Sequence, residues 1–363
     1  MKNKKHILFV MPTLSGGGAE RIISYLANNI NRENYIPEIL LIYQTNHIFI
    51  KNIAADIKIN YLNLDINKKY FFLQTLKGIL RIKPDIVLLG LSGINVLVSP
   101  FIPLFNRKIR WVARETNIAS LHVTNNRMLF LYRYFYKNYD TIITQSNDMK
   151  NDLVSNFKID HRKMIIINNP IDTNFIDSQL NIESPVSYSP DKINLLACGR
   201  LNQQKGFDLL IKAFSTLTNK DKYHLTIIGK SESEEYTEYL HSLIEENNLE
   251  DYISFKGFQS NSFKWFQKAD IFILSSRYEG FPNVLLESLY CGTPVLANNC
   301  KGGINEIVIN NENGFVYDYK KNDFEQNLEL ISSKKFSSKH LSQIAKERFG
   351  LNKIIRQYES VFK

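Results

Sequence analysis

Short apolar segments alternate with amphipathic segments along this chain, and the alternation runs through two series. The first series of apolar segments covers 6–11, 38–42, 85–89, 109–113, 141–144 and 164–168, with amphipathic stretches such as 19–31, 71–81 and 127–138. The second series covers 193–198, 223–229, 252–257, 270–275 and 294–298. Strands that alternate with helices form parallel sheets covered by helices on both faces. The sequence therefore predicts an α/β protein with two doubly wound, Rossmann-like domains.

The segment between the two series predicts where the domains separate. Residues 168–192 are rich in Asn, Ser, Pro and Asp and show no periodicity, which is typical of a linker. A chain of 363 residues also exceeds the size at which a single core usually stops growing. We expect a first domain over 1–172, a linker over 173–192, a second domain over 193–345 and a final helix over 346–363.

One uncharged stretch imitates a membrane span. Residues 86–106 are long enough for a transmembrane helix, but they contain Gly90, Gly93, Pro100 and Pro103. A buried parallel strand over 85–89, a turn and a short buried helix explain the stretch better. The apolar run at the amino terminus is too short for a signal peptide, and the three cysteines form no CxxC pair. We expect a cytoplasmic protein without a spanning segment.

The positive charge lies in the first half of the chain. Residues 1–175 contain 23 Lys and Arg against 12 Asp and Glu, a net charge of +11, whereas residues 176–363 contain 22 against 24, a net charge of −2. A basic domain attracts nucleic acid, anionic membranes or phosphorylated substrates. The sequence contains no helix-turn-helix, zinc-finger or RNP-like signature, so nucleic acid is disfavoured.

Two glutamates, Glu279 and Glu287, stand eight positions apart in the segment SRYEGFPNVLLESL. On one helix this interval leaves the side chains about 80° apart, so a single helix face does not explain it. Glu279 follows a predicted strand, where ligands of parallel sheets bind, and Asn283 is suited to cap a helix that carries Glu287 on its second turn. Backbone amides at the start of that helix offer an anion site, formed by Gly280, Phe281, Asn283 and Val284.

Two more loops follow predicted strands. The segment GRLNQQKG places Arg200 and Lys205 between a strand and a helix, a pair of cations suited to hold a diphosphate. The glycines Gly16, Gly17 and Gly18 follow the first strand and let backbone amides approach an anion. The dinucleotide-binding motif GxGxxG fails because Arg21 occupies its third glycine position, and no acidic residue ends the second strand. A nicotinamide-dependent dehydrogenase is therefore disfavoured.

Together these motifs resemble glycosyltransferase family 4, whose members are retaining enzymes that use nucleotide sugars. The likeness rests on GGGAER, GRLNQQKG and EGFPNVLLE, the last being similar to the family's two acids separated by seven residues, and it extends over nearly the whole chain. It implies the GT-B fold, in which two Rossmann-like domains face each other across a cleft and the last helix crosses back to the first domain. It also implies a hexosyltransferase without a metal or other cofactor, and no Asp-x-Asp motif occurs in the sequence.

The resemblance assigns roles to individual residues. Arg200 and Lys205 would hold the donor diphosphate and neutralise the leaving group, Glu279 would bind the transferred sugar, and Glu287 would bind the ribose. The other donor-side residues would be Gly280, Phe281, Pro282, Asn283, Val284, Phe258 beside the base, and Gly16, Gly17 and Gly18 across the cleft. On the acceptor or sugar side the family's segment corresponds to Arg114, Glu115 and Thr116, with His122 as a substitute for the histidine that relatives often carry at position 116.

The likeness is greatest to bacterial transferases that build surface polysaccharide or lipid-linked oligosaccharide. It implies a UDP-linked sugar donor and a polyprenyl-diphosphate-linked glycan acceptor, in biosynthesis of the O-antigen or capsule type. We expect a peripheral protein on the inner face of the cytoplasmic membrane, where the basic first domain and the aromatic helix within 125–140 would meet anionic lipid. Two alternatives remain open: a nucleotide-sugar epimerase of the same fold, and a non-catalytic glycan-binding protein.

Overall fold

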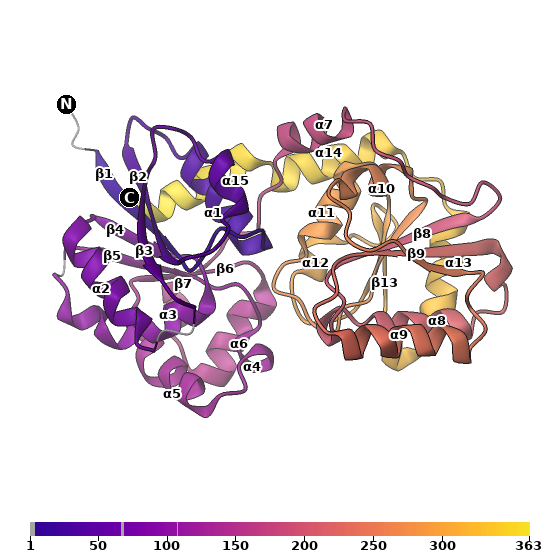
Figure 1. The fold of residues 1–363 in the computed structure, drawn as a ribbon, viewed down its shortest axis with the longest axis horizontal. Helices are drawn as coiled ribbons and strands as arrows, with labels where there is room; N and C mark the ends of the chain where they lie inside the picture. Colours follow the sequence, from indigo (N-terminus) through magenta and orange to yellow (C-terminus); the bar gives the residue numbers. More distant parts are fainter. Residues whose placement is uncertain (1–3, 67–68, 107) are drawn as a thin grey trace. The chain divides into compact units, whose positions relative to one another are not determined.

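The computed structural model describes residues 4–66, 69–106 and 108–363, which form two compact units. Unit 1 consists of the chain up to Pro170 together with Leu351–Lys363, and unit 2 consists of Ile171–Gly350. Each unit contains one parallel sheet between two layers of helices (Figure 1). The predicted fold class, two Rossmann-like α/β domains, is confirmed.

The sheet of unit 1 is built from parallel strands. The strands are β1 (Lys5–Met11), β2 (Tyr35–Tyr43), β3 (Lys58–Leu64), β4 (Ile86–Leu89), β5 (Arg110–Arg114), β6 (Thr141–Thr144) and β7 (Met164–Ile166). Their order is β3-β2-β1-β4-β5-β6-β7. The helices are α1 (Gly18–Asn29), α2 (Phe71–Ile82), α3 (Ser92–Val98), α4 (Ala119–His122), α5 (Asn126–Phe135), α6 (Asn147–Phe157) and α15 (Leu351–Phe362). Short 3-10 helices are η1 (Ile48–Asn52), η2 (Ser99–Leu104), η3 (Tyr136–Asn138) and η4 (His161–Lys163).

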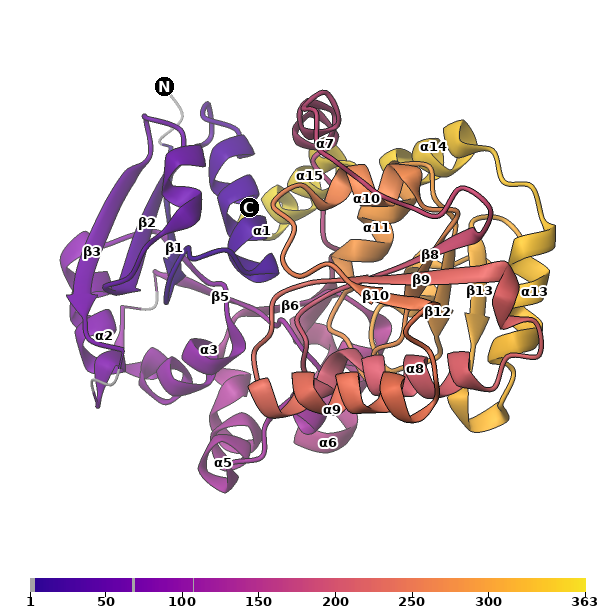
Figure 2. The ribbon, with the colours of Figure 1, turned by 45° about the vertical axis from the view of Figure 1, so that its right-hand side comes forward.

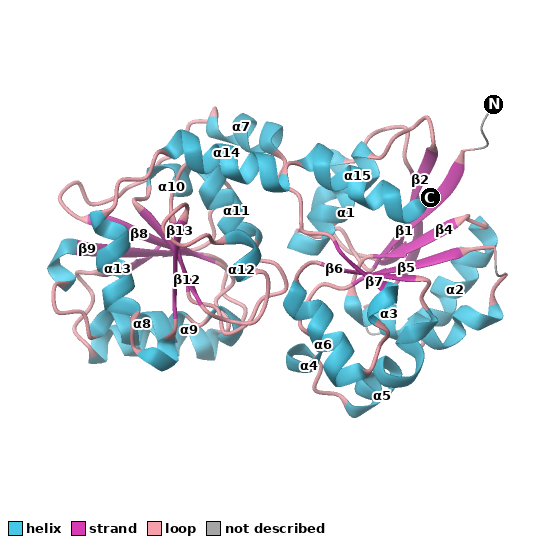
Figure 3. Ribbon diagram, turned by 180° about the vertical axis from the view of Figure 1, so that it is seen from behind, coloured by secondary structure: helices cyan, strands magenta, loops and turns pink. Residues whose placement is uncertain are grey.

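The strands of unit 1 are apolar throughout because both faces of the sheet are buried. Along β1, Leu8 and Val10 pack toward α2, α3, α5 and α6, whereas Ile7 and Phe9 pack toward α1 and α15. The alternation follows from the two-residue repeat of a strand. Figure 3 shows the two helical layers on opposite faces of the sheet.

The last helix, α15, packs in unit 1. Its buried side chains Ile354, Ile355, Tyr358, Val361 and Phe362 join the core beneath α1. The preceding helix, α14 (Ser338–Phe349), lies in unit 2, so the chain passes from one unit to the other between Gly350 and Leu351. The expected start of the final helix at residue 346 falls inside α14.

Unit 2 repeats the design with the strand order β10-β9-β8-β11-β12-β13. The strands are β8 (Ile193–Cys198), β9 (Tyr223–Ile228), β10 (Ile253–Phe255), β11 (Ile271–Leu274), β12 (Val295–Asn298) and β13 (Gly314–Tyr317). The helices are α7 (Thr173–Leu180), α8 (Phe207–Ser215), α9 (Glu234–Glu246), α10 (Ser262–Lys268), α11 (Asn283–Tyr290), α12 (Ile304–Ile307), α13 (Phe324–Ser333) and α14. The 3-10 turns are η5 (Gln203–Lys205), η6 (Lys220–Lys222) and η7 (Tyr319–Lys321). Helices α8, α9 and α13 share one core, while α7, α10, α11, α12 and α14 share the core on the other face (Figure 2).

Two expectations about local structure need correction. The sequence pattern missed β3 and β13, because β3 has only one fully buried residue and β13 is a four-residue strand that begins with a glycine. The segment expected as an unstructured linker begins with α7, whose start is capped when the side chain of Asp172 accepts from the amide of Phe175 at 3.1 Å. Ile176 is the buried residue of this helix, and the half-buried Phe175 and Leu180 pack against the same core.

The uncharged stretch over 86–106 folds as predicted, into the buried strand β4, a turn, and the short helix α3 followed by η2. Within the described ranges, no helix is both long and apolar enough to cross a membrane.

The strand order of each sheet reverses at one point. In unit 1 the reversal lies between β1 and β4, and in unit 2 it lies between β8 and β11. Loops that leave the carboxyl ends of such strands diverge and expose backbone groups, which is why ligands of open α/β sheets bind there. The loops after β8 and β11 are the two that carry Arg200, Lys205 and Glu279.

Candidate active site

Lys205 and Glu279 form an ion pair at the reversal point of unit 2. The Nζ of Lys205 lies 2.6 Å from Oε1 of Glu279, and the hydroxyl of Ser276 donates to the same oxygen at 2.6 Å. The two side chains of the pair are 15% and 8% exposed. The stem of Lys205 packs against Gly199, where a Cβ would come within 3.2 Å of three of its carbons. The structure therefore brings together the cation and the acid that the sequence placed on separate loops.

Arg200 lies on the same loop as Lys205 but is directed toward a different carboxylate. Its Nη1 lies 2.6 Å from Oε1 of Glu232, and the amide of Asn202 donates to the other oxygen of Glu232 at 2.6 Å. The Arg200 side chain is 59% exposed. Hydrogen bonds from Asn202 and Arg200 outweigh the effect of burial and hold the pKa of Glu232 below its usual value. Glu232 is thus an ionised competitor for the guanidinium that was expected to bind phosphate.

The segment after Glu279 approaches the loop that follows β12. The amide of Glu279 donates to the carbonyl of Lys301 at 2.9 Å. A Cβ on Gly302, whose φ is +138°, would lie 2.5 Å from the carbonyl oxygen of Glu279, and a Cβ on Gly303 would lie 2.3 Å from the ring of Phe281. Because only glycine permits these approaches, the Lys301–Gly303 segment helps to fix the backbone of the loop that carries Glu279.

Helix α11 begins one residue earlier than a cap at Asn283 would require. Pro282 occupies the N-cap position with φ −78°, and Asn283 is the first helical residue. The fixed φ of proline suits the entry to a helix, which explains the correction. Phe281 is buried and packs edge-on against Phe349 at 5.9 Å, so its ring belongs to the core of unit 2. Glu287 lies on the second turn, as predicted, and is buried.

The remaining donor-side residues of unit 2 differ in exposure. Gly280 and Pro282 are buried, and Val284 is half-buried against the core. Phe258 is 71% exposed and follows Gly257, which has a positive φ of 63°. The carbonyl of Gly257 accepts from the amide of Gly229 at 2.8 Å, which anchors this loop to the end of β9.

The glycine loop of unit 1 is occupied by a side chain of its own helix. The amides of Gly16 and Gly17 donate to Oε2 of Glu20 at 2.8 and 2.6 Å, while Thr13 donates to the other oxygen. This is a capping box at the start of α1, which begins at Gly18. The amides that were expected to bind an anion therefore donate to the carboxylate of Glu20.

Arg114 lies in the interior of unit 1. Its Nε donates to the hydroxyl of Tyr358 on α15 at 3.0 Å, and its Nη2 donates to Oδ1 of Asn169 at 2.6 Å. Only 1% of Arg114 is exposed. This arginine therefore fastens the last helix to the end of β5.

Glu115 is also buried, among hydroxyl groups. Its Oε2 accepts from Tyr136 at 2.8 Å and from Tyr132 at 3.0 Å, and Ser92 donates to its Oε1. Burial raises the pKa of Glu115 to about 7, although the hydrogen bonds oppose the shift. The carboxyl group, in the loop after β5, therefore links Ser92 at the start of α3 to Tyr132 on α5 and to Tyr136 directly after α5.

The other two residues of that segment lie nearer the surface. The hydroxyl of Thr116 lies 2.8 Å from that of Ser92. Nδ1 of His122 lies 3.3 Å from the side-chain nitrogen of Asn117, at an exposed position. In the part of the chain that the structure describes, no cluster of three or more His, Cys, Asp or Glu side chains is arranged to hold a metal ion.

Family models match both units. Residues 16–175 match the model described as Glycosyltransferase Family 4, and residues 181–348 match the model described as Glycosyl transferases group 1. The chain belongs to glycosyltransferase family 4. As a member of that family it is a hexosyltransferase, and the resemblance read from the three loop motifs is confirmed.

Curated relatives of this glycosyltransferase fall into two groups by coverage. An uncharacterized glycosyltransferase of Haemophilus influenzae is 27% identical over 99% of both chains. An uncharacterized glycosyltransferase of Methanocaldococcus jannaschii is 32% identical over 65% of this chain and 60% of its own. The N-acetylgalactosamine-N,N'-diacetylbacillosaminyl-diphospho-undecaprenol 4-alpha-N-acetylgalactosaminyltransferase of Campylobacter jejuni is 33% identical over 59% of this chain and 57% of its own. The matches to the last two span about three fifths of those proteins.

Solved structures share the fold of the transferase. HepE of Anabaena, in complex with UDP-glucose, aligns with a TM-score of 0.77 at 18% identity over 99% of both chains. This likeness confirms the GT-B class, with a Rossmann-like domain on each side of residue 170.

Sequence reasoning missed several residues that shape the site of the transferase. The Lys301–Gly303 segment has a visible signal, a Gly-Gly pair in the loop after the strand β12. Glu232 and Glu20 have no comparable signal, since each is a polar residue in a loop or first helical turn.

Proposed function

We propose that this glycosyltransferase transfers a sugar from a UDP-linked donor to a polyprenyl-diphosphate-linked glycan, with retention of the anomeric configuration and without a metal ion. The observation that carries the proposal is the buried pair of Lys205 and Glu279 at the reversal point of unit 2. A cation there neutralises a leaving diphosphate, while the carboxylate accepts hydrogen bonds from sugar hydroxyls.

The donor is supported by three groups on adjacent loops. Lys205, the exposed Arg200 and the backbone amides before α11 supply positive charge or hydrogen-bond donors for phosphate oxygens. Donor binding requires Lys205 to share its ammonium between Glu279 and the phosphate, and Arg200 to exchange Glu232 for the phosphate. The complex of HepE with UDP-glucose supports uridine as the base.

A donor panel tests this assignment. We expect a UDP-sugar to raise the melting temperature more than the matched GDP-, dTDP- and CMP-sugars, since a ligand at 100 times its Kd adds about 2.7 kcal/mol to stability. Lys205→Ala, Arg200→Ala and Glu279→Ala should each abolish transfer in folded protein. Full activity of the Arg200/Lys205 double variant would overturn the assignment. Incubation with donor alone separates an epimerase, which converts the sugar nucleotide without any acceptor.

The acceptor class is supported by the Campylobacter relative, whose name specifies an undecaprenol-linked diphosphate substrate. The test offers radiolabelled donor with either a short polyprenyl-diphosphate glycan or the same glycan without its lipid diphosphate. Label transferred only to the lipid-linked form supports the proposal. Equal transfer to both forms would favour a free saccharide acceptor.

Membrane docking is supported by a surface on α5 and the turn after it. Phe130 and Tyr134 are 53% and 51% exposed and lie 4.6 Å apart, centroid to centroid. Arg127, Arg133 and Lys137 are exposed beside them. Aromatic rings at headgroup depth flanked by basic groups are typical of proteins that rest on anionic lipid.

Vesicle flotation tests the docking surface. The protein should float with vesicles that contain phosphatidylglycerol and not with phosphatidylcholine alone. Changing Arg127, Arg133 and Lys137 to Gln should abolish flotation. The matched control changes Lys51, Lys77 and Arg81, three exposed basic residues elsewhere in unit 1, to Gln and should float normally. Equal loss in both variants would show a general charge effect and not a docking site.

A further inference from the structure

Three consecutive carbonyls of the Lys205 turn accept hydrogen bonds from the neighbouring loop. The carbonyl of Gln203 accepts from Nη1 of Arg277 at 2.7 Å, and that of Gln204 accepts from the amide of Arg277 at 2.8 Å. The carbonyl of Lys205 accepts from the hydroxyl of Ser275 at 2.8 Å. The turn that carries the cation is thus fixed at each carbonyl by the loop that carries Glu279.

Glycine makes this close approach possible. Gly206 has a φ of +65°, and a Cβ there would lie 2.3 Å from the carbonyl oxygen of Ser275. The two loops are therefore in direct main-chain contact beside Lys205. A small shift of either loop would move the ammonium.

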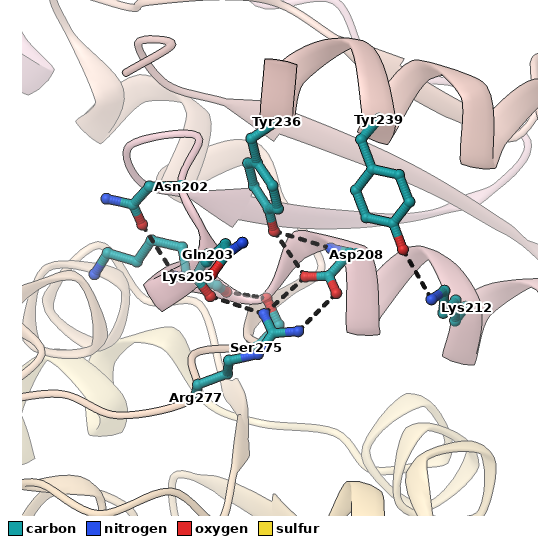
Figure 4. Close-up of polar contacts among 9 residues, drawn as sticks. All are labelled: Asn202, Gln203, Lys205, Asp208, Lys212, Tyr236, Tyr239, Ser275 and Arg277. Atoms are coloured by element: carbon teal, nitrogen blue, oxygen red, sulfur yellow. Dashed lines mark hydrogen bonds and ion pairs between the residues drawn. The ribbon is translucent and has the colours of Figure 1, made fainter. Parts of the chain in front are cut away.

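The guanidinium of Arg277 is itself held by a buried carboxylate. Asp208, on the first turn of α8, accepts from Nη1 at 2.8 Å and from Nη2 at 2.7 Å, which is the planar two-bond geometry of a strong Arg–carboxylate pair. Asp208 is only 6% exposed, and the hydroxyl of Tyr236 on α9 donates to it at 2.7 Å. Figure 4 shows Arg277 between Asp208 and the main chain at Gln203, with Tyr236 on the other side of the carboxylate.

The charge state of the cluster is secure at neutral pH. Burial alone would raise the pKa of Asp208, but the hydrogen bonds from Arg277 and Tyr236 outweigh it and the pKa lies below its ordinary value. The pKa of Arg277 is raised by the bond to Asp208. Both groups are therefore ionised.

The geometry points to Arg277 and Asp208 as positioning residues that set where the ammonium of Lys205 meets the donor diphosphate. This inference rests on the proposed role of Lys205 toward the diphosphate. Arg277 acts through the Gln203 and Gln204 carbonyls, and Asp208 acts by orienting the guanidinium. An interaction with a leaving group loses much of its effect when its partner moves by about 1 Å, which commonly costs two orders of magnitude in rate.

Removal of Arg277 alone leaves a buried unpaired carboxylate, so loss of activity in that variant would be ambiguous. The double variant Asp208→Asn/Arg277→Met removes both charges and should recover much of the melting temperature. It does not restore the bond to the Gln203 carbonyl. We expect it to bind UDP at least about tenfold more weakly than the wild type while binding uridine equally well, since uridine lacks the diphosphate.

The control is a contact between α8 and α9, the helices of Asp208 and Tyr236, that does not reach the loops of Lys205 and Glu279. Nζ of Lys212 on α8 lies 2.9 Å from the hydroxyl of Tyr239 on α9, one turn along from Asp208 and Tyr236 (Figure 4). Lys212→Met should leave the affinities for UDP and uridine unchanged. If the double variant binds UDP as tightly as the control does, the cluster has no positioning role.

A thermodynamic cycle separates this inference from the proposed function. In a Lys205→Met background, Asp208→Asn/Arg277→Met should cause no further loss of UDP affinity, because both changes act through one ammonium. Additive losses would overturn the positioning role while leaving Lys205 as a phosphate ligand. Unchanged UDP affinity in Lys205→Met itself would instead overturn the proposed role of Lys205, and the inference would fall with it.

Discussion

The ammonium of Lys205 and the carboxylate of Glu279 meet at 2.6 Å although 74 positions separate them in the sequence. Each is the counter-charge of the other in a site that admits little water. The pair makes the burial of both charges tolerable, and in the proposed function it also holds both groups where the donor's phosphate and sugar would lie.

Breaking this pair should cost stability as well as activity. Lys205→Met leaves a buried carboxylate unpaired and should lower the free energy of unfolding by roughly 3–5 kcal/mol. Lys205→Met/Glu279→Gln should be clearly more stable than Lys205→Met and equally inactive in transfer. Urea unfolding of both proteins measures the difference. Equal destabilisation would mean that the ion pair is solvated and its burial unimportant.

In the wild-type protein, the carboxylate of Glu232 should weaken donor binding. Because its carboxylate engages Arg200, Glu232→Gln should tighten UDP binding by about 1.4- to 5-fold, the range expected for a partly exposed ion pair. Calorimetry with UDP measures the change. Glu235→Gln, which removes the same charge from an exposed position nearby, controls for net charge and should bind UDP as the wild type does. Weaker UDP binding by Glu232→Gln would show that Glu232 orients Arg200 for the phosphate.

Gly302 should not tolerate a side chain. Gly302→Ala places a Cβ 2.5 Å from the Glu279 carbonyl and forces alanine to a φ of +138°, so we expect at least about 1–3 kcal/mol of destabilisation and reduced transfer. Gly93→Ala on α3 is the matched control, since nothing lies within 4 Å of the added carbon. Alanine favours helix there by up to about 1 kcal/mol. Similar melting temperatures for the two variants would contradict the role of the Gly302 approach.

Glu115 should make unit 1 less stable as the pH rises toward 7. Its pKa of about 7 in the folded protein exceeds the ordinary value of 4.5, so between these values the folded state keeps a proton that the unfolded state has lost. Stability is then fully present below pH 4.5 and falls as the pH rises to 7, by an amount on the order of 3 kcal/mol.

Glu115→Gln removes that titration while keeping the size of the side chain. The difference in melting temperature between the variant and the wild type should change across pH 5 to 7.5 and level off above it. A difference that is constant with pH would mean that Glu115 is ionised throughout that range in the folded protein.

Local chemistry predicted which loops lie at the end of the second sheet, because loop residues that follow parallel strands lie at one edge of the sheet. Arg200, Lys205 and Glu279 were placed in this way, and the structure puts Lys205 against Glu279. The same reasoning could not predict that Arg200 engages Glu232 or that Glu20 fills the glycine loop. These contacts depend on side-chain directions, which spacing along the sequence does not specify.

Strand prediction succeeded for the continuous apolar strands and missed β3 and β13, each of which lies at one end of its sheet. The segments β1, β4 and β8 are continuous apolar runs, so their pattern is visible. The edge strand β3 has only one fully buried residue, Leu64, and carries Lys58 and Asn60, whose side chains donate to Glu38 of β2. Its contacts with β2 stabilise it, so the residues of β3 alone do not show that it is a strand.

The sequence by itself determined the class of fold and the residue types of the site, because periodicity, glycine and charge act over a few neighbouring positions. Only the tertiary structure decided how those residues function together. Two ion pairs join segments far apart in the chain: Lys205 with Glu279, and Arg277 with Asp208. The burial of Arg114 and Glu115 likewise depends on segments that are distant in the sequence. Their energies depend on distance and on the exclusion of water, which are properties of the folded chain.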